Sequence, residues 1–137
     1  MHPETATDVI QGILLTGGSN FGLAATAGVM NWLADHGIGA PTDAGPLPTV
    51  SSAVIFDLIF AKGSLRPDAA LGYAASQAVN SGPVAEGSVG AGAGATVGKI
   101  YGRPMKGGVG TASWQIPGGP MGSSHCRREC LRRHMGP

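Results

Sequence analysis

The chain has 137 residues, a length that fits one ordinary domain able to bury a core. Only 12% of its residues are charged, against about 25% in typical soluble domains, and 24 are glycine. We therefore expect one layer of a larger protein, or a surface that partners cover. No apolar run reaches the ~18 residues of a membrane span and no signal peptide is visible, so a cytoplasmic chain without a membrane partner is expected.

The first predicted elements are a strand and a helix. The apolar run 8–16 favours a buried strand that ends at two glycines. Asn20 is the expected N-cap of a helix that runs to about residue 36, where Gly37 supplies a common helix stop. Residues 37–48 are rich in glycine and proline, which predicts a loop.

Two more strands and a second helix follow. The apolar, partly β-branched run 50–60 predicts a strand. Pro67 at a helix start, with Asp68 in the first turn, predicts a helix to about residue 80. Residues 107–116 favour a last strand. This order of strands and helices indicates a mixed α/β layer that is incomplete by itself.

The glycine-rich segment 82–98 is the most unusual stretch. Between apolar elements, its glycines are expected to let the backbone approach a neighbouring strand or a ligand. A phosphate loop is excluded, because that motif needs glycine at the position of Ala93 and Ser or Thr at the position of Ile100. A dinucleotide fingerprint over 90–95 has no strand leading into it, so no cofactor is predicted.

Ser19 lies at the corner between the first predicted strand and helix. Its surroundings resemble the Gly-x-Ser-x-Gly nucleophile elbow, but Phe21 stands where the last glycine is required. No histidine or acidic partner stands out in the sequence. A capping serine is therefore favoured over a catalytic one.

The last 17 residues differ from the rest in composition. They hold four arginines and both cysteines, whereas the chain through Pro120 has five basic and seven acidic side chains. Cys126, Cys130 and His134 are four residues apart, but structural zinc sites usually need four ligands, so no metal is predicted. The arginines would attract phosphates. Without aromatic or fold context, nucleic acid is not expected as a partner.

Five stretches, taken together and in order, are distinctive. They are ILLTGGSNFGLAATAGVMNWLADHGIG, SSAVIFDL, RPDAALGYAA, VAEGSVGAGAGATVGK and MKGGVGTAS. This series resembles the DmpA family of L-aminopeptidase/D-esterases, β-peptidyl aminopeptidases and nylon-oligomer hydrolases. The resemblance implies an incomplete αββα sandwich of the type shared with ornithine acetyltransferase. It also implies small peptide, amino-acid amide or ester, or amide-oligomer substrates, and a homo-oligomeric parent with its own small subunit.

The resemblance also implies a mechanism. In this family the precursor cleaves itself before a Ser or Thr, which becomes the nucleophile at the N-terminus of the small subunit. The free amine of that residue can accept the proton of its own hydroxyl. The resemblance further implies an Asn side chain that donates to the oxyanion of the tetrahedral intermediate.

The family pattern assigns roles to a few positions. Lys99 matches a lysine near the nucleophile of the nylon-hydrolase branch, where it would hold charge in the pocket; the alternative is a lysine that only caps its loop. Phe56 stands where nylon hydrolases have a catalytic Tyr. Gly17, Gly18 and Ser19 are expected at the substrate cleft together with Phe56, the glycines mainly as its architecture.

Neither the nucleophile nor the oxyanion Asn is found in this sequence. We therefore expect residues 1–119 to be a partial large-subunit region, inactive alone, and residues 120–137 to be an aberrant, disordered tail. A slip of the reading frame near residue 120 would explain the tail, because the codons of 125–133, shifted by one base, permit IVVVNAFGD. Two alternatives remain: a fragment of an acyltransferase resembling ornithine acetyltransferase, or a non-catalytic protein whose basic tail binds nucleic acid or metal.

Overall fold

The structure is a computed structural model that describes residues 9–60, 63–115, 117–118 and 121–127, the last of these as backbone only. It divides into two compact units, Met1–Ser81 and Gly82–Pro137, which are described separately. Together they contain helices and strands, which confirms the mixed α/β class. The sequence predicts a different boundary, near residue 119, on the basis of composition and reading frame. The division into two units does not test that boundary, so it stays a prediction. Within the described residues no helix is long and apolar enough to cross a membrane.

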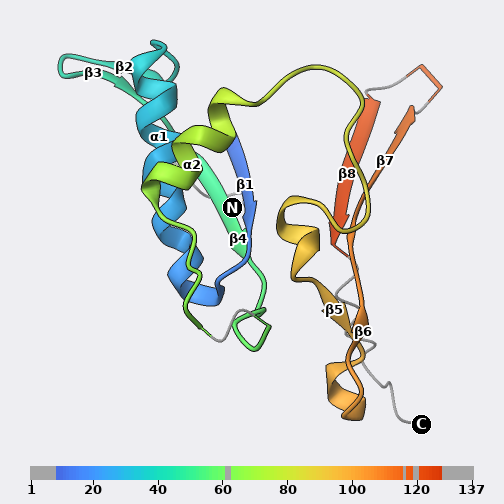
Figure 1. The fold of residues 1–137 in the computed structure, drawn as a ribbon. Coiled ribbons are helices and arrows are strands. Elements are labelled where there is room, and N and C mark those ends of the chain that lie inside the picture. Colours follow the sequence, from blue (N-terminus) through green and yellow to red (C-terminus); the bar gives the residue numbers. More distant parts are fainter. Residues whose placement is uncertain (1–8, 61–62, 116, 119–120, 128–137) are drawn as a thin grey trace, which may run out of the picture. The chain divides into compact units, whose positions relative to one another are not determined.

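The first unit is built on two parallel strands. Strand β1 (Gly12–Thr16) pairs with β4 (Val50–Val54) in a register that runs from Gly12 opposite Val50 to Thr16 opposite Val54. Helix α1 (Ala25–Asp35) contacts both strands, and α2 (Ala69–Gln77) packs along α1 (Figure 1). A hydrogen bond of 2.7 Å between the hydroxyls of Thr26 and Ser52 joins α1 to the sheet.

Two glycines bring the helices together. A Cβ on Gly28 would lie 1.8 Å from the carbonyl oxygen of Ala69, and a Cβ on Gly72 would lie 2.0 Å from that of Ala25. Side chains at either position would push the helices apart, so the backbones approach closely only because both residues are glycine.

The start of the first helix differs from the prediction. A 3-10 helix, η1 (Ser19–Ala24), precedes α1, and Asn20 lies inside η1 instead of capping a helix. No side chain caps the first turn of α1, because η1 leads directly into it. The end of α1 is as predicted: Gly37 has φ +71°, its N–H donates to Ala34 O, and the next N–H donates to Leu33 O, which is a Schellman motif.

The second helix is capped by Asp68. Its carboxylate accepts a hydrogen bond of 2.9 Å from the N–H of Leu71, and α2 ends at Gln77, three residues earlier than predicted. Pro67 therefore precedes the cap and is not the first helical residue. The extended backbone of Asp68 explains this placement, since an N-cap residue lies outside the helical region.

Two predicted boundaries in this unit are wrong. The expected loop 37–48 contains a short antiparallel hairpin of β2 (Ala40–Thr42) and β3 (Gly45–Leu47). The expected strand 50–60 ends at Val54, because the chain then enters a turn in which the Phe60 N–H donates to Asp57 O.

The second unit consists of short elements. The 3-10 helix η2 (Gly90–Ala93) is followed by β5 (Thr96–Val97), the 3-10 helix η3 (Lys99–Tyr101) and β6 (Met105–Lys106), which pairs with β5. Strand β7 (Val109–Gln115) confirms the last predicted strand, and it pairs antiparallel with β8 (Met121–Arg127) (Figure 1). Strand β8 lies in the tail for which disorder was expected, and residues 128–137, with Cys130 and His134, lie outside the described residues.

The glycine-rich segment is used for backbone packing. Gly87 and Val109 exchange two backbone hydrogen bonds of 2.7 and 2.8 Å. A Cβ on Gly92 would lie 2.3 Å from Gly87 O, and one on Gly108 would lie 2.8 Å from the same atom. Of the two uses predicted for these glycines, close approach to a neighbouring strand is confirmed.

Candidate functional site

The corner at the carboxyl end of β1 is held by contacts to segments that are distant in the sequence. The strand ends at Thr16, and the chain turns through Gly17, Gly18 and Ser19 into η1. The N–H of Ser19 donates to Ile55 O at 2.9 Å, and the N–H of Ile55 donates to Thr16 O at 3.0 Å. The corner is therefore tied to the chain that leaves the neighbouring parallel strand β4.

Asp57 holds this corner through its side chain. One carboxylate oxygen, Oδ1, accepts a hydrogen bond of 2.7 Å from the N–H of Gly18. The other, Oδ2, lies so close to Gly17 that a Cβ there would be 2.2 Å away. Hydrogen bonds to a charged acceptor are stronger than neutral ones, so this contact fixes the corner firmly.

The backbone of the corner requires glycine at two positions. Gly18 has φ +81°, and a Cβ on it would lie 2.6 Å from Cδ of Pro67. Gly22 faces the corner from η1, and a Cβ on it would lie 1.9 Å from Gly17 O. A side chain at Gly17 or Gly18 would thus meet Asp57 or Pro67. The place of these glycines at a substrate cleft stays a prediction.

Ser19 itself has an unusual backbone. Its φ of +53° is the only positive value at a non-glycine residue among those described. Such residues are uncommon, and they persist where the surrounding structure determines the conformation. The residue opens η1, for which the structure shows no side-chain cap, so the capping role favoured for Ser19 is not observed.

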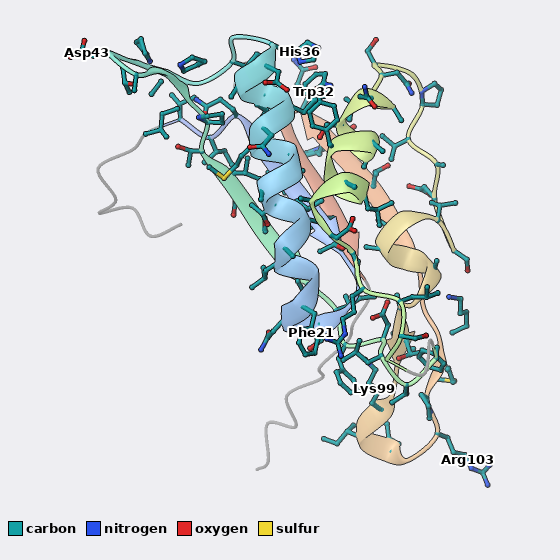
Figure 2. All side chains as sticks on the ribbon, turned by 60° about the vertical axis from the view of Figure 1, so that its left-hand side comes forward. Phe21, Trp32, His36, Asp43, Lys99 and Arg103 are labelled. Atoms are coloured by element: carbon teal, nitrogen blue, oxygen red, sulfur yellow. The ribbon has the colours of Figure 1, made fainter. Side chains whose placement is uncertain are left out.

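Two aromatic residues lie close to this corner in the sequence. Phe56 directly precedes Asp57 and has 48% of its surface exposed. Phe21 belongs to η1 (Figure 2). The guanidinium of Arg66 lies over its ring, with Cζ 3.7 Å from the ring centroid. The cation–π contact joins η1 to the segment that precedes α2, and it supports the same part of the fold as Asp57.

Lys99 belongs to the second unit, whereas Gly17, Gly18, Ser19 and Phe56 belong to the first. It opens η3 in the connection between β5 and β6 (Figure 2), where Gly98 and Gly102 both have positive φ. Its side chain is partly buried. The choice between a pocket lysine and a loop-capping lysine stays open.

The side chain of Lys106 donates two hydrogen bonds to backbone carbonyls. Its Nζ donates to Gly92 O at 3.1 Å and also to Ala93 O, both at the end of η2. Gly92 O also accepts the backbone N–H of Ala95 at 3.2 Å, so the lysine adds a charged contact to the carbonyls at the end of η2. We assign Lys106 a role in holding η2 against β6.

Glu86 is a second carboxylate that accepts a hydrogen bond from a distant backbone N–H. Its Oε1 accepts hydrogen bonds from the N–H and the hydroxyl of Thr111 in β7, at 2.7 and 2.9 Å. The backbone hydrogen bond, and then the hydroxyl, lower the pKa of Glu86 from its usual value. The ionised carboxylate is thus favoured in the folded chain.

Sequence reasoning did not single out Asp57 or Glu86. Asp57 is the one acidic residue in the apolar run 50–60, and an isolated acid in such a run is a signal for a structural or functional role. Its partner is 39 residues away, so the contact itself could not be found from local sequence. Glu86 is similarly separated from Thr111 by 25 residues.

Comparison with known proteins identifies the family. The model of peptidase family S58 matches residues 4–125, which is most of the chain. The chain therefore belongs to peptidase family S58, the family of DmpA-type peptidases. The match continues a few residues past position 119, where the family likeness was expected to end.

Individual relatives agree with this assignment. The chain is 42% identical over 127 residues to an uncharacterized aminopeptidase of Mycobacterium leprae, covering 88% of this chain and 34% of the relative. It is 44% identical over 119 residues to an uncharacterized aminopeptidase of Mycobacterium tuberculosis, covering 87% of this chain and 33% of that relative. It is 39% identical over 93 residues to a 6-aminohexanoate-oligomer endohydrolase of Paenarthrobacter ureafaciens, covering 68% and 26%. The chain thus spans about a third or less of these relatives' length.

Proposed function

We propose that this chain forms part of an amide-bond hydrolase that acts on N-terminal peptide bonds, amino-acid amides or esters, or linear amide oligomers. The observation that carries the proposal is the match to peptidase family S58 over residues 4–125. The names of the relatives, aminopeptidase and 6-aminohexanoate-oligomer endohydrolase, both describe hydrolysis of amide bonds. These names favour the hydrolase over an acyltransferase.

The chemistry needs a nucleophile that lies outside this sequence region. By resemblance to the DmpA family, we place a self-generated N-terminal Ser or Thr and an oxyanion-binding Asn in the part of the relatives that this chain does not match. The α-amine of the nucleophile would accept the proton of its hydroxyl, and the Asn would donate to the developing oxyanion. The chain contributes the scaffold on which the site is completed, within an αββα sandwich, and it is inactive alone.

A hybrid enzyme tests this proposal. The segment of the Mycobacterium tuberculosis relative that matches this chain is replaced by residues 4–125 of this chain. Self-cleavage is followed by gel electrophoresis, and hydrolysis is measured with amino-acid p-nitroanilides and with 6-aminohexanoate oligomers. The control is the same hybrid with its cleavage-site Ser or Thr changed to Ala, which abolishes both events.

We expect the hybrid to cleave itself and to hydrolyse at least one of the two substrate classes. A folded hybrid that does neither, while the parental relative does both, contradicts the proposal. Acyl transfer to an added amino acid that outpaces hydrolysis assigns the chain to the acyltransferase alternative. The substrate that is turned over faster decides between the peptide and the oligomer branch.

A further inference from the structure

The two oxygens of the Asp57 carboxylate meet two consecutive residues of the corner after β1. Oδ1 accepts the Gly18 N–H at 2.7 Å, and Oδ2 occupies the space that a side chain at position 17 would fill. The next residue, Ser19, has φ +53°, a backbone conformation that non-glycine residues rarely adopt. The carboxylate thus contacts the two residues that directly precede a strained serine.

The other carboxylates with hydrogen bonds to backbone N–H groups do something simpler. Asp68 caps an ordinary helix, and Glu86 joins a connecting segment to a strand. Neither is next to a non-glycine residue with positive φ. Backbone strain that the surroundings maintain is concentrated at functional positions, so the corner held by Asp57 is the stronger candidate.

Several contacts keep Ser19 from relaxing. Its N–H donates to Ile55 O at 2.9 Å, which ties it to the chain leaving β4. Pro67 lies close to Gly18, because a Cβ on Gly18 would be 2.6 Å from its Cδ. Gly22, in η1, lies close to Gly17, because a Cβ on Gly22 would be 1.9 Å from Gly17 O. The hydrogen bond from the Gly18 N–H to the Asp57 carboxylate differs from these three contacts because its acceptor is charged. A single substitution at Asp57 removes it.

We propose that Asp57 is a positioning residue that holds the corner Gly17–Ser19 in its strained conformation, so that the corner presents Ser19 to the amide substrate. This role rests on the proposed amide hydrolysis. Asp57 acts through the corner and does not itself touch the reacting atoms. Its loss weakens substrate binding more than it slows the chemical step, because the nucleophile is carried by another part of the enzyme.

Amide hydrogen exchange of the full 137-residue chain tests the positioning directly. Exchange of the Gly18 N–H is compared in the unaltered chain, Asp57→Ala, Asp57→Asn and Asp68→Ala. We expect Asp57→Ala to accelerate exchange at Gly18 about tenfold or more, the loss expected for one hydrogen bond to a charged group. Asp57→Asn keeps an acceptor oxygen and retains most of the protection. Asp68→Ala removes a similar bond elsewhere in the unit and leaves Gly18 unchanged.

Steady-state kinetics of the hybrid enzyme test the link to substrate. We expect Asp57→Ala to raise KM about tenfold with kcat changed less than about twofold, since one hydrogen bond to a charged group is involved. Asp57→Asn restores most of the lost affinity. Asp68→Ala lowers stability but leaves KM and kcat unchanged, so a general loss of folding is distinguished from a change in positioning.

Each result has one meaning. Unchanged exchange at Gly18 in Asp57→Ala overturns the positioning role, whatever the activity. Accelerated exchange with an unchanged KM overturns the link to substrate and leaves Asp57 as a folding residue. A hybrid that is inactive with Asp57 intact counts against the proposed function and removes the substrate part of this inference, while the exchange experiment still decides whether Asp57 holds the corner.

Discussion

Glu86 and Thr111 form a two-point contact in which one carboxylate oxygen accepts both the backbone N–H and the hydroxyl of the threonine, at 2.7 and 2.9 Å. The contact lies next to the pair Gly87 and Val109, which exchange backbone hydrogen bonds. Two consecutive residues near the start of the second unit therefore bind β7: Glu86 binds Thr111, and Gly87 binds Val109. Because the acceptor is ionised, the strength of the attachment depends on pH.

The first prediction concerns that pH dependence. The pKa of Glu86 is lowered on folding, from a usual value of 4.5, so the folded chain binds fewer protons than the unfolded chain. The contribution of Glu86 to stability is therefore present above the unfolded pKa and is lost as the pH falls through the folded pKa. We expect Glu86→Gln to destabilise the second unit at pH 7 and to match the unaltered chain in acid, as measured by exchange of the Thr111 N–H. Thr111→Val, which keeps the backbone donor, gives a smaller effect.

The second prediction concerns the contact between the two helices. Gly28→Ala would bring a methyl group within 1.8 Å of Ala69 O, so α2 must shift. We expect a net loss of about 1–3 kcal/mol in the free energy of unfolding, the usual range for overpacking, because the helix propensity gained, about 1 kcal/mol, offsets only part of the strain. Urea denaturation measures the change. In the control Gly12→Ala, the new Cβ has its nearest neighbours at an ordinary 3.6 Å, and the midpoint stays nearly unchanged.

The third prediction concerns the N-cap of α2. Asp68→Ala removes the acceptor of the Leu71 N–H and is expected to lower the free energy of unfolding by about 1 kcal/mol. Asp68→Ser, which can still cap the helix, recovers most of that loss. Thermal unfolding followed by circular dichroism measures both variants. Equal stability of the Ala and Ser variants would show that the cap bond is not formed in solution.

A local signal in the sequence was enough to predict the end of α1, where Gly37 adopts the left-handed conformation. The start of α2 was predicted only approximately: Pro67 was expected at the helix start with Asp68 in the first turn, whereas Asp68 is the N-cap and Pro67 precedes it. Asn20 failed as a cap because the turn after β1 is set by Asp57 and Pro67, far away in the sequence.

Contacts between distant segments could not be predicted in the same way. The strand 50–60 was predicted too long, since its apolar pattern continues beyond Val54 while its backbone hydrogen bonds become local. The hairpin 40–47 was missed because Pro41 and Pro46 argue against a strand, although they lie opposite each other in its register. The candidate site shares this limit: the glycines of the corner were expected, but the carboxylate that holds them was not.

The fourth prediction separates the two roles left open for Lys99. In the hybrid enzyme we expect Lys99→Met to lower kcat about tenfold or more, because a positive charge near the nucleophile stabilises developing negative charge. Lys106→Met is the matched control: it removes a lysine that binds Gly92 O and Ala93 O, so it lowers stability and leaves kcat unchanged. Equal kinetic effects of the two substitutions would show that Lys99 only supports its loop.

The last prediction concerns Phe56, which by resemblance stands where nylon hydrolases have a catalytic Tyr. The side chain is 48% exposed, so there is room for an added hydroxyl. We expect Phe56→Tyr in the hybrid to raise kcat on 6-aminohexanoate oligomers about tenfold, less than the ~10²–10³ that a preorganised oxyanion donor supplies. Phe60→Tyr makes the same change at a residue that is 55% exposed in the neighbouring turn, and it leaves kcat unchanged. A rise in both variants, or in neither, would place Phe56 outside the reacting site.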